Sequence, residues 1–126
     1  MAVLSADSLP WNSSILESIQ ESKSSGKPVL ALVYADWCPY CKELENNTLP
    51  QKTVQKELQG FHLVRLDGEA FPNFKKKYGI EGYPSLLVFN GNLEILGKLV
   101  GSPSRDQLLQ FLKKAKETSD SQSNSK

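Results

Sequence analysis

The sequence contains little cysteine, a single histidine and almost no net charge. Its 126 residues include two cysteines, and the formal net charge at pH 7 is +1. Two cysteines are too few for the disulfide framework of a small secreted protein, and with one histidine they cannot supply the four ligands of a structural zinc site. Binding to nucleic acid requires concentrated basic charge, which is also absent. The sequence therefore predicts no metal and no nucleic-acid partner.

Long hydrophobic runs are missing as well. No stretch approaches the roughly 18 apolar residues that a membrane span requires, so we expect none. Residues 1–4 lack the basic region and the full apolar region of a signal peptide. A trimmed mature chain would lack such a peptide too, so this absence leaves the compartment open.

The length and composition indicate one ordinary domain. Hydrophobic residues make up 39% of the chain and charged residues 23%, which is typical of a soluble α/β protein with a real core. We expect an N-terminal segment at 1–10, a folded domain at 11–116, and a polar, low-complexity tail at 117–126 that is disordered.

The order of apolar patterns predicts an α/β fold. Ser14 and Glu17 have the spacing of a capping box at the start of a helix over about 12–24. The almost continuously apolar run at 29–35 is typical of a central strand buried on both faces. The further expected elements are a helix from about 38 that Pro50 breaks or kinks, strands at 61–67, 84–89 and 93–100, and helices at 69–78 and from 102 onward. This order predicts a central mixed β-sheet flanked by helices on both faces.

The two cysteines, Cys38 and Cys41, are separated by two residues and stand directly after the predicted central strand. This spacing at a helix start lets the two sulfurs close a small ring. It also places the first sulfur beside unpaired backbone N–H groups, which favour the thiolate that attacks a disulfide. The pair is therefore predicted to carry out reversible thiol–disulfide exchange.

Two motifs together resemble a known family. Residues 34–42, Tyr-Ala-Asp-Trp-Cys-Pro-Tyr-Cys-Lys, resemble the active site of the thioredoxin superfamily, and residues 82–85, Gly-Tyr-Pro-Ser, resemble its cis-proline loop. Residues 35–38 and 42–48 are most similar to the C-terminal domain of the membrane reductase DsbD. The similarity covers about residues 11–116. It implies a thioredoxin fold and a monomeric protein disulfide oxidoreductase with no cofactor beyond its own redox-active disulfide.

The resemblance also implies a separate role for each residue of the C-x-x-C segment. Cys38 attacks a substrate disulfide, and the more buried Cys41 resolves the mixed disulfide. Pro39 and Tyr40 tune the stability of the thiolate, and Lys42 is a candidate for supporting its charge, although an exposed position on the helix is the alternative. Pro-Tyr also occurs in glutaredoxins and in some isomerase-like proteins, so this dipeptide does not fix the direction of electron flow.

Four residues are expected to contact substrates. A cis bond before Pro84 would place the backbone of Tyr83 beside the cysteines, where an extended substrate segment pairs by strand addition. Tyr83 stands where thioredoxins usually carry threonine, so its bulk is expected to select substrates. Trp37 and Tyr40 are expected to border the same surface.

Leu32 departs from the family pattern. It occupies the position, six residues before Cys38, where thioredoxins and the DsbD domain carry a buried aspartate that helps to deprotonate the resolving cysteine. Water, Asp36 or Glu43 would have to accept the proton instead.

The resemblance favours a reductase that an upstream thiol donor keeps reduced and that acts on protein disulfides or thiols in cell redox homeostasis. It also favours an extracytoplasmic compartment such as the bacterial periplasm, with the cytoplasm as the alternative. A dithiol oxidase or a disulfide isomerase is the alternative within redox chemistry. A glutaredoxin-like iron–sulfur carrier or a non-catalytic binding module is the alternative of another class.

Overall fold

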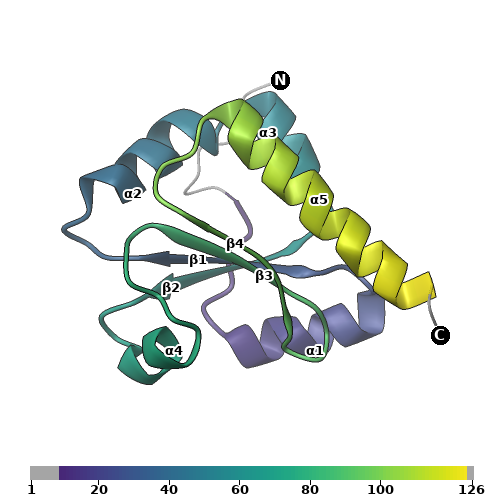
Figure 1. Ribbon diagram of the computed structural model, residues 1–126. Coiled ribbons are helices and arrows are strands. Elements are labelled where there is room, and N and C mark those ends of the chain that lie inside the picture. The colour runs from purple at the N-terminus through teal and green to yellow at the C-terminus, as the bar shows by residue number, and fades with distance from the viewer. Residues whose placement is uncertain (1–8, 125–126) are drawn as a thin grey trace.

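A mixed sheet of four strands forms the centre of the molecule in the computed structural model, which describes residues 9–124 (Figure 1). The strand order is β2-β1-β3-β4. The central strand β1 (Val29–Tyr34) runs parallel to β2 (His62–Asp67) and antiparallel to β3 (Ser85–Phe89). At the far edge, β4 (Ile95–Val100) pairs antiparallel with β3.

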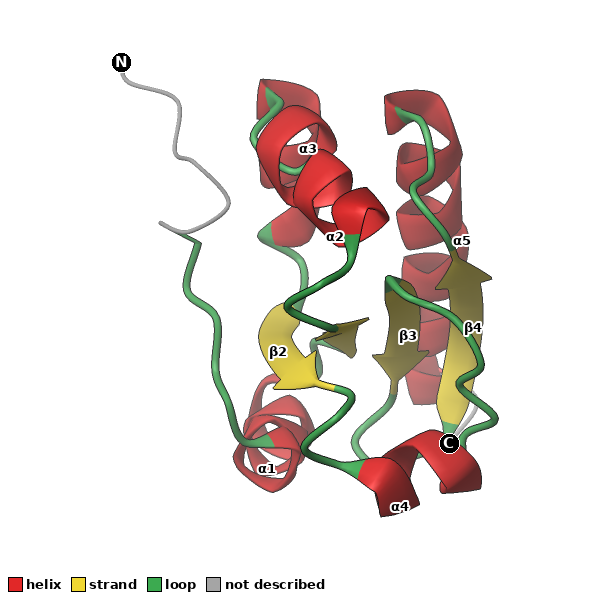
Figure 2. Cartoon of the chain, turned by 90° about the vertical axis from the view of Figure 1, so that its left-hand side faces the viewer, coloured by secondary structure: helices red, strands yellow, loops and turns green. Residues whose placement is uncertain are grey.

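Helices cover both faces of this sheet, as the sequence predicts. The helices α1 (Ile15–Ser25) and α4 (Pro72–Lys77) lie on one face. The other face is covered by α3 (Lys52–Leu58), by α5 (Arg105–Asn124) and by the segment that carries the cysteines (Figure 2). None of the helices between residues 9 and 124 is long and apolar enough to cross a membrane.

The continuous apolar run of β1 is explained by these two layers. Leu30 and Leu32 belong to the core under α3 and α5, whereas Val29, Ala31 and Val33 belong to the core under α1 and α4. All five side chains have no exposed surface. Successive side chains of a strand point to opposite faces, so a strand buried on both faces needs apolar residues at every position.

The first helix begins later than the predicted residue 12, because Asn12 extends the sheet instead. Asn12 forms an isolated parallel bridge with Val64 of β2, and its backbone donates to Leu63 O and accepts from Arg65 N at 2.8 and 2.9 Å. The predicted cap is present, since Ser14 Oγ accepts from the backbone N–H of Glu17 at 3.2 Å. Gly26 ends the helix with a φ of 80°, a conformation that glycine adopts without strain.

The C-terminal segment corrects the prediction of a disordered tail from residue 117. Helix α5 continues to Asn124, so residues 117–124 are helical. Ser119 is buried, and Gln122 Oε1 accepts from the side-chain amide of Asn90 in the β3–β4 turn at 3.0 Å. Polar composition alone does not reveal such contacts with a distant turn. The expected disorder at 125–126 and most of the N-terminal segment, residues 1–8, lie outside the described residues.

Candidate active site

The cysteine pair lies where β1 gives way to helix α2 (Pro39–Glu43), which continues into the π-helical turn η2 (Leu44–Thr48). Cys38 is the N-cap residue of α2 and is joined to Cys41 by a disulfide, with the two Cα atoms 5.3 Å apart. The backbone N–H of Cys41 donates to Cys38 Sγ at 3.1 Å. Proline suits the first helical position because it has no N–H to leave unpaired there. The helix start thus directs a hydrogen-bond donor at the first sulfur.

Both cysteines are buried to the same extent in this disulfide form, with 2% of each residue exposed. The expected difference, with Cys41 more buried than Cys38, is therefore absent in this redox state. The physical reason is that the two sulfurs are bonded to each other and both cysteines pack in one cluster with Ala35, Tyr34 and Tyr83.

The side chains between and beside the cysteines face solvent. Trp37 and Tyr40 are 67% and 61% exposed, which is unusual for large aromatic side chains. Pro39 and Lys42 are exposed as well. The structure therefore places two aromatic side chains on the surface directly around the buried disulfide.

The predicted proline loop lies against the same site. The Tyr83–Pro84 peptide bond is cis, and β3 begins at the next residue. Pro84 O accepts from the backbone N–H of Gly101 at 2.8 Å. Among residues 9–124, by contrast, no hydrogen bond to the backbone N–H or C=O of Tyr83 is found. The backbone N–H and C=O of Tyr83 thus have no hydrogen-bond partner among these residues, while Tyr83 itself packs against the two cysteines.

The position where the family carries an aspartate lies in the apolar core. Leu32 is fully buried, and its partner across the β1–β2 pair is Arg65. Arg65 binds Glu45 of η2 through two nitrogens, with Nε donating to Oε1 at 2.6 Å and Nη2 donating to Oε2 at 3.2 Å. Its guanidinium also stacks 3.7 Å from the ring centre of Tyr34. Asp36 and Glu43, the two predicted proton acceptors, are exposed.

The sequence interpretation missed Glu45 and Arg65. Burial lowers the pKa of Arg65, but the hydrogen bond and charge of Glu45 and the contact with Tyr34 raise it by more, so the net pKa is raised and the guanidinium stays charged. The Glu45 side chain is 12% exposed, which makes it the more enclosed of the two partners. Glu45 and Arg65 are 20 residues apart in the sequence, so no local spacing could have indicated their pairing.

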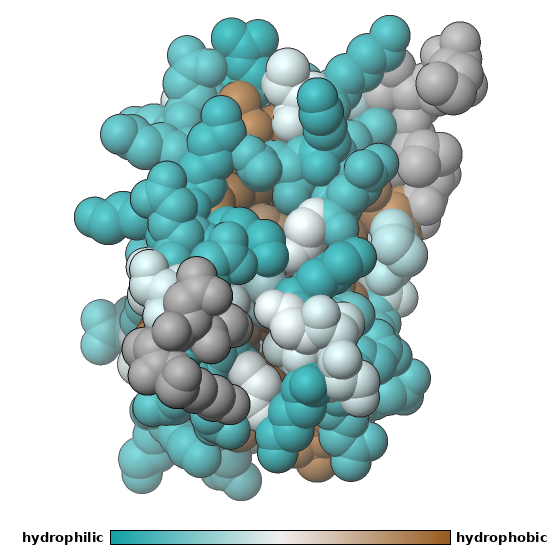
Figure 3. All heavy atoms as spheres, turned by 90° about the vertical axis from the view of Figure 1, so that its right-hand side faces the viewer, coloured by the Kyte–Doolittle hydropathy of each residue, from teal (hydrophilic) through white to brown (hydrophobic). Residues whose placement is uncertain are grey.

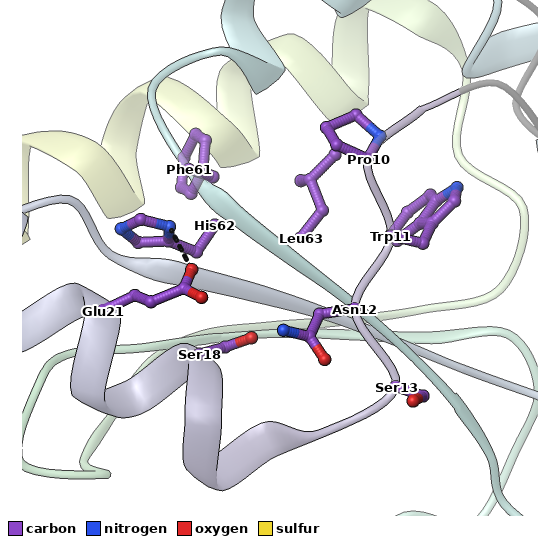
Figure 4. A pocket seen from close by; sticks show the side chains of 9 residues that line it. All are labelled: Pro10, Trp11, Asn12, Ser13, Ser18, Glu21, Phe61, His62 and Leu63. Carbon is purple, nitrogen blue, oxygen red and sulfur yellow. Dashed lines mark ion pairs between the residues drawn. The ribbon is translucent and has the colours of Figure 1, made fainter.

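His62, the single histidine, lies far from the cysteines. It begins β2 at the end of the sheet opposite to the one where β1 leads to Cys38. Its Nδ1 lies 3.3 Å from Glu21 Oε2, and its Nε2 lies 2.6 Å from Ser25 Oγ. It lines a pocket of about 500 Å³ between α1, β2 and residues 10–13 (Figure 4). Within the described part of the chain, no three His, Cys, Asp or Glu side chains gather as a metal site.

These features agree with comparisons to known proteins. A family model described as a thioredoxin-like domain matches residues 16–116. The chain belongs to this thioredoxin-like family. The thiol:disulfide interchange protein DsbD of Yersinia pestis is 34% identical over 97 residues, which cover 72% of this chain and 16% of that protein. The chain thus spans about a sixth of the length of such relatives.

Solved structures give the same assignment. The oxidised C-terminal domain of DsbD from Neisseria meningitidis has a TM-score of 0.71 and 26% identity, over 79% of this chain and 90% of that one. An oxidoreductase named DsbH has a TM-score of 0.75 and 20% identity, over 86% and 85% of the two chains, and supports the fold alone. The predictions of a thioredoxin fold and of similarity to the DsbD domain are confirmed. This thioredoxin-like chain carries a C-x-x-C pair that is joined by a disulfide.

Proposed function

We propose that the protein reduces disulfides in other proteins, with Cys38 as the nucleophile and Cys41 as the resolving thiol. The observation that carries this proposal is the juxtaposition of a buried cysteine pair, exposed aromatic side chains and the unpaired backbone of Tyr83 at one end of the sheet. The similarity to DsbD supports the reducing direction and an extracytoplasmic compartment such as the periplasm, in which an upstream dithiol would regenerate the reduced protein.

The reaction balances as two thiol–disulfide exchanges. The Cys38 thiolate attacks one sulfur of the substrate disulfide, which forms a mixed disulfide and releases a substrate thiolate that takes up a proton. Cys41 then loses its proton and attacks the Cys38 sulfur, which restores the disulfide seen here and releases the second substrate thiol. Two electrons and two protons pass to the substrate. An upstream dithiol reverses the change on the protein and is itself oxidised.

The local structure suits Cys38 for the first step. Its sulfur accepts the N–H of Cys41, and it caps the positive end of the helical segment that begins at Pro39. Both effects stabilise a thiolate relative to a thiol. A more stable thiolate is present in a larger fraction at neutral pH, and only the thiolate attacks a disulfide.

The surface around the site suits a protein substrate rather than a small molecule. Among residues 9–124, six large hydrophobic side chains are exposed, and four of them, Trp37, Tyr40, Phe71 and Val100, follow or end the strands β1, β2 and β4. These three strands run in one direction, so their ends meet at the end of the sheet where the cysteines lie. The opposite end is predominantly hydrophilic (Figure 3). Apolar surface gathered at one place marks a docking surface.

The direction of electron flow is tested by titrating the protein against glutathione redox buffers and alkylating free thiols to read the dithiol fraction. We expect a strongly reducing potential, closer to the value of about −270 mV for thioredoxin than to about −120 mV for DsbA. A protein with both cysteines replaced by serine is the control for alkylation elsewhere. A potential near −120 mV would reverse the proposed direction and support the oxidase alternative.

A further inference from the structure

The carboxylate of Glu69 accepts hydrogen bonds from Trp37 and Tyr83, two aromatic residues beside the cysteines. Glu69 lies in the turn between β2 and α4. Its Oε1 accepts from the indole Nε1 of Trp37 at 3.2 Å, and its Oε2 accepts from the hydroxyl of Tyr83 at 3.2 Å. The rings of Trp37 and Tyr83 also meet edge to face, with their centres 5.7 Å apart. The two aromatic side chains therefore form one unit that is tied to Glu69.

The residue before Glu69 makes room for this unit. A Cβ atom built on Gly68 would lie 2.8 Å from Cζ of Tyr83 and closer still to Cε1 and the hydroxyl oxygen, so the Tyr83 ring would have to shift. Gly68 does not have a positive φ, so alanine would suit its backbone. The absence of a side chain at residue 68 thus serves close contact with the Tyr83 ring rather than an unusual backbone conformation.

Lys75 of α4 completes the cluster. Its ammonium lies 3.7 Å from Glu69 Oε2 and 4.8 Å from the ring centre of Tyr83. The contact with Tyr83 raises the pKa of Lys75, and the charge of Glu69 adds to this. The cation therefore offsets the carboxylate charge beside the aromatic pair.

Stability alone does not account for this arrangement. The Glu69 side chain is 53% exposed, and ion pairs and hydrogen bonds between exposed groups contribute little to folding. The same contacts have a larger consequence for binding, because a free Trp37 and a free Tyr83 would each lose rotational freedom when a substrate docks. Side chains that are already fixed before docking avoid that loss.

We propose that Gly68 and Glu69 form a seat, a fixed support for the Tyr83 and Trp37 side chains, which keeps the surface beside Cys38 ordered for a substrate segment. Glu69 is a positioning residue, and the fit of the Tyr83 ring against Gly68 determines which substrates enter. Because the Tyr83 ring packs against Gly68, it does not cover the Tyr83 backbone, whose N–H and C=O are available to pair with an extended substrate segment. A displaced ring would be free to cover that backbone. This inference rests on the proposed function, since it concerns how that same site admits protein disulfides.

The first test compares the Gly68→Ala and Glu69→Ala variants with the unaltered protein in two reactions. With insulin, a protein disulfide, we expect KM to rise about fivefold with kcat retained. The reason is that substrate binding must then also fix one or two side chains, which costs free energy. With hydroxyethyl disulfide, which is too small to depend on the aromatic surface beside Cys38, we expect less than a twofold change. Equal losses in both reactions would overturn the proposal, because they would indicate disturbed cysteines.

A double-mutant cycle tests whether the effect of Gly68→Ala on KM acts through the Tyr83 ring. Because Gly68→Ala acts by displacing the Tyr83 ring, we expect it to have no further effect on KM in a Tyr83→Ala background. Additive effects of the two substitutions would contradict the proposal.

The fluorescence anisotropy of Trp37 gives a readout that does not depend on catalysis. In a Trp11→Phe background, Trp37 is the remaining tryptophan. We expect its anisotropy to fall in the Glu69→Ala variant, because the indole loses its hydrogen bond, and to fall less in Glu69→Gln, whose amide oxygen still accepts. An unchanged anisotropy would refute the seat. If the unaltered protein fails to reduce insulin while the anisotropy falls as expected, the proposed function is wrong and the seat stands.

Discussion

The Cys38→Ser variant is expected to lose insulin reduction by more than about 10³-fold, the scale on which removal of an essential nucleophile acts. A serine hydroxyl is not ionised at neutral pH and cannot form a disulfide, so neither of the two exchange steps can take place. The N-cap position accepts serine readily, so the helix start is retained. The measurement is the rate at which the reduced protein precipitates insulin chains.

The matched control is Cys41→Ser, which keeps the nucleophile and removes only the resolving thiol. Each molecule of this variant is expected to attack one substrate disulfide and then stop, because its Cys38 remains held in the mixed disulfide. Insulin reduction by Cys38→Ser at the unaltered rate would show that Cys38 is not the attacking group.

Replacement of Leu32 by aspartate is expected to destabilise the protein by about 3–5 kcal/mol at neutral pH, a large part of the stability of an ordinary domain. Leu32 is fully buried beneath α3 and α5, so the introduced carboxylate would lose its hydration. The nearest cation across the sheet, Arg65, already binds Glu45 and stacks on Tyr34. Urea unfolding measures the effect.

The loss of stability in the Leu32→Asp variant is expected to depend on pH. Burial raises the pKa of the introduced carboxyl in the folded protein above its value of about 4 in the unfolded chain. The variant is therefore most stable relative to the unaltered protein below pH 4, and it loses stability as the pH rises toward the folded pKa. The Leu32→Ala variant leaves a cavity without a charge and is expected to show no such pH dependence. A Leu32→Asp variant with unaltered stability would mean that this part of the core is not dry.

The sheet, its helical cover and the position of the cysteines could be predicted from the sequence because the signals are local. The apolar run at 29–35 has the length and continuity of a strand covered on both sides, and the capping box at Ser14 marks a helix start. Pro39 after Cys38 marks another. Each of these signals depends on neighbours within a few residues.

The parts that were missed depend on contacts between distant segments. Residue 12 pairs with β2 rather than entering a helix, and the polar residues after 116 remain helical because they meet the β3–β4 turn. The contacts of Glu69 with Trp37 and Tyr83 join three segments of the chain. No spacing within one segment reveals such a partner, so an acidic residue in a turn is indistinguishable from a solvated one.

The most direct test of the central claim is intact mass spectrometry of the reduced Cys41→Ser variant after mixing with oxidised insulin. Without a resolving thiol, the first exchange cannot proceed to the second. We predict a covalent adduct in which one insulin molecule is bound through a disulfide to Cys38, which peptide mapping locates and dithiothreitol releases. Absence of this adduct, in a protein that still reduces insulin with both cysteines present, would contradict a mechanism that begins with attack by Cys38.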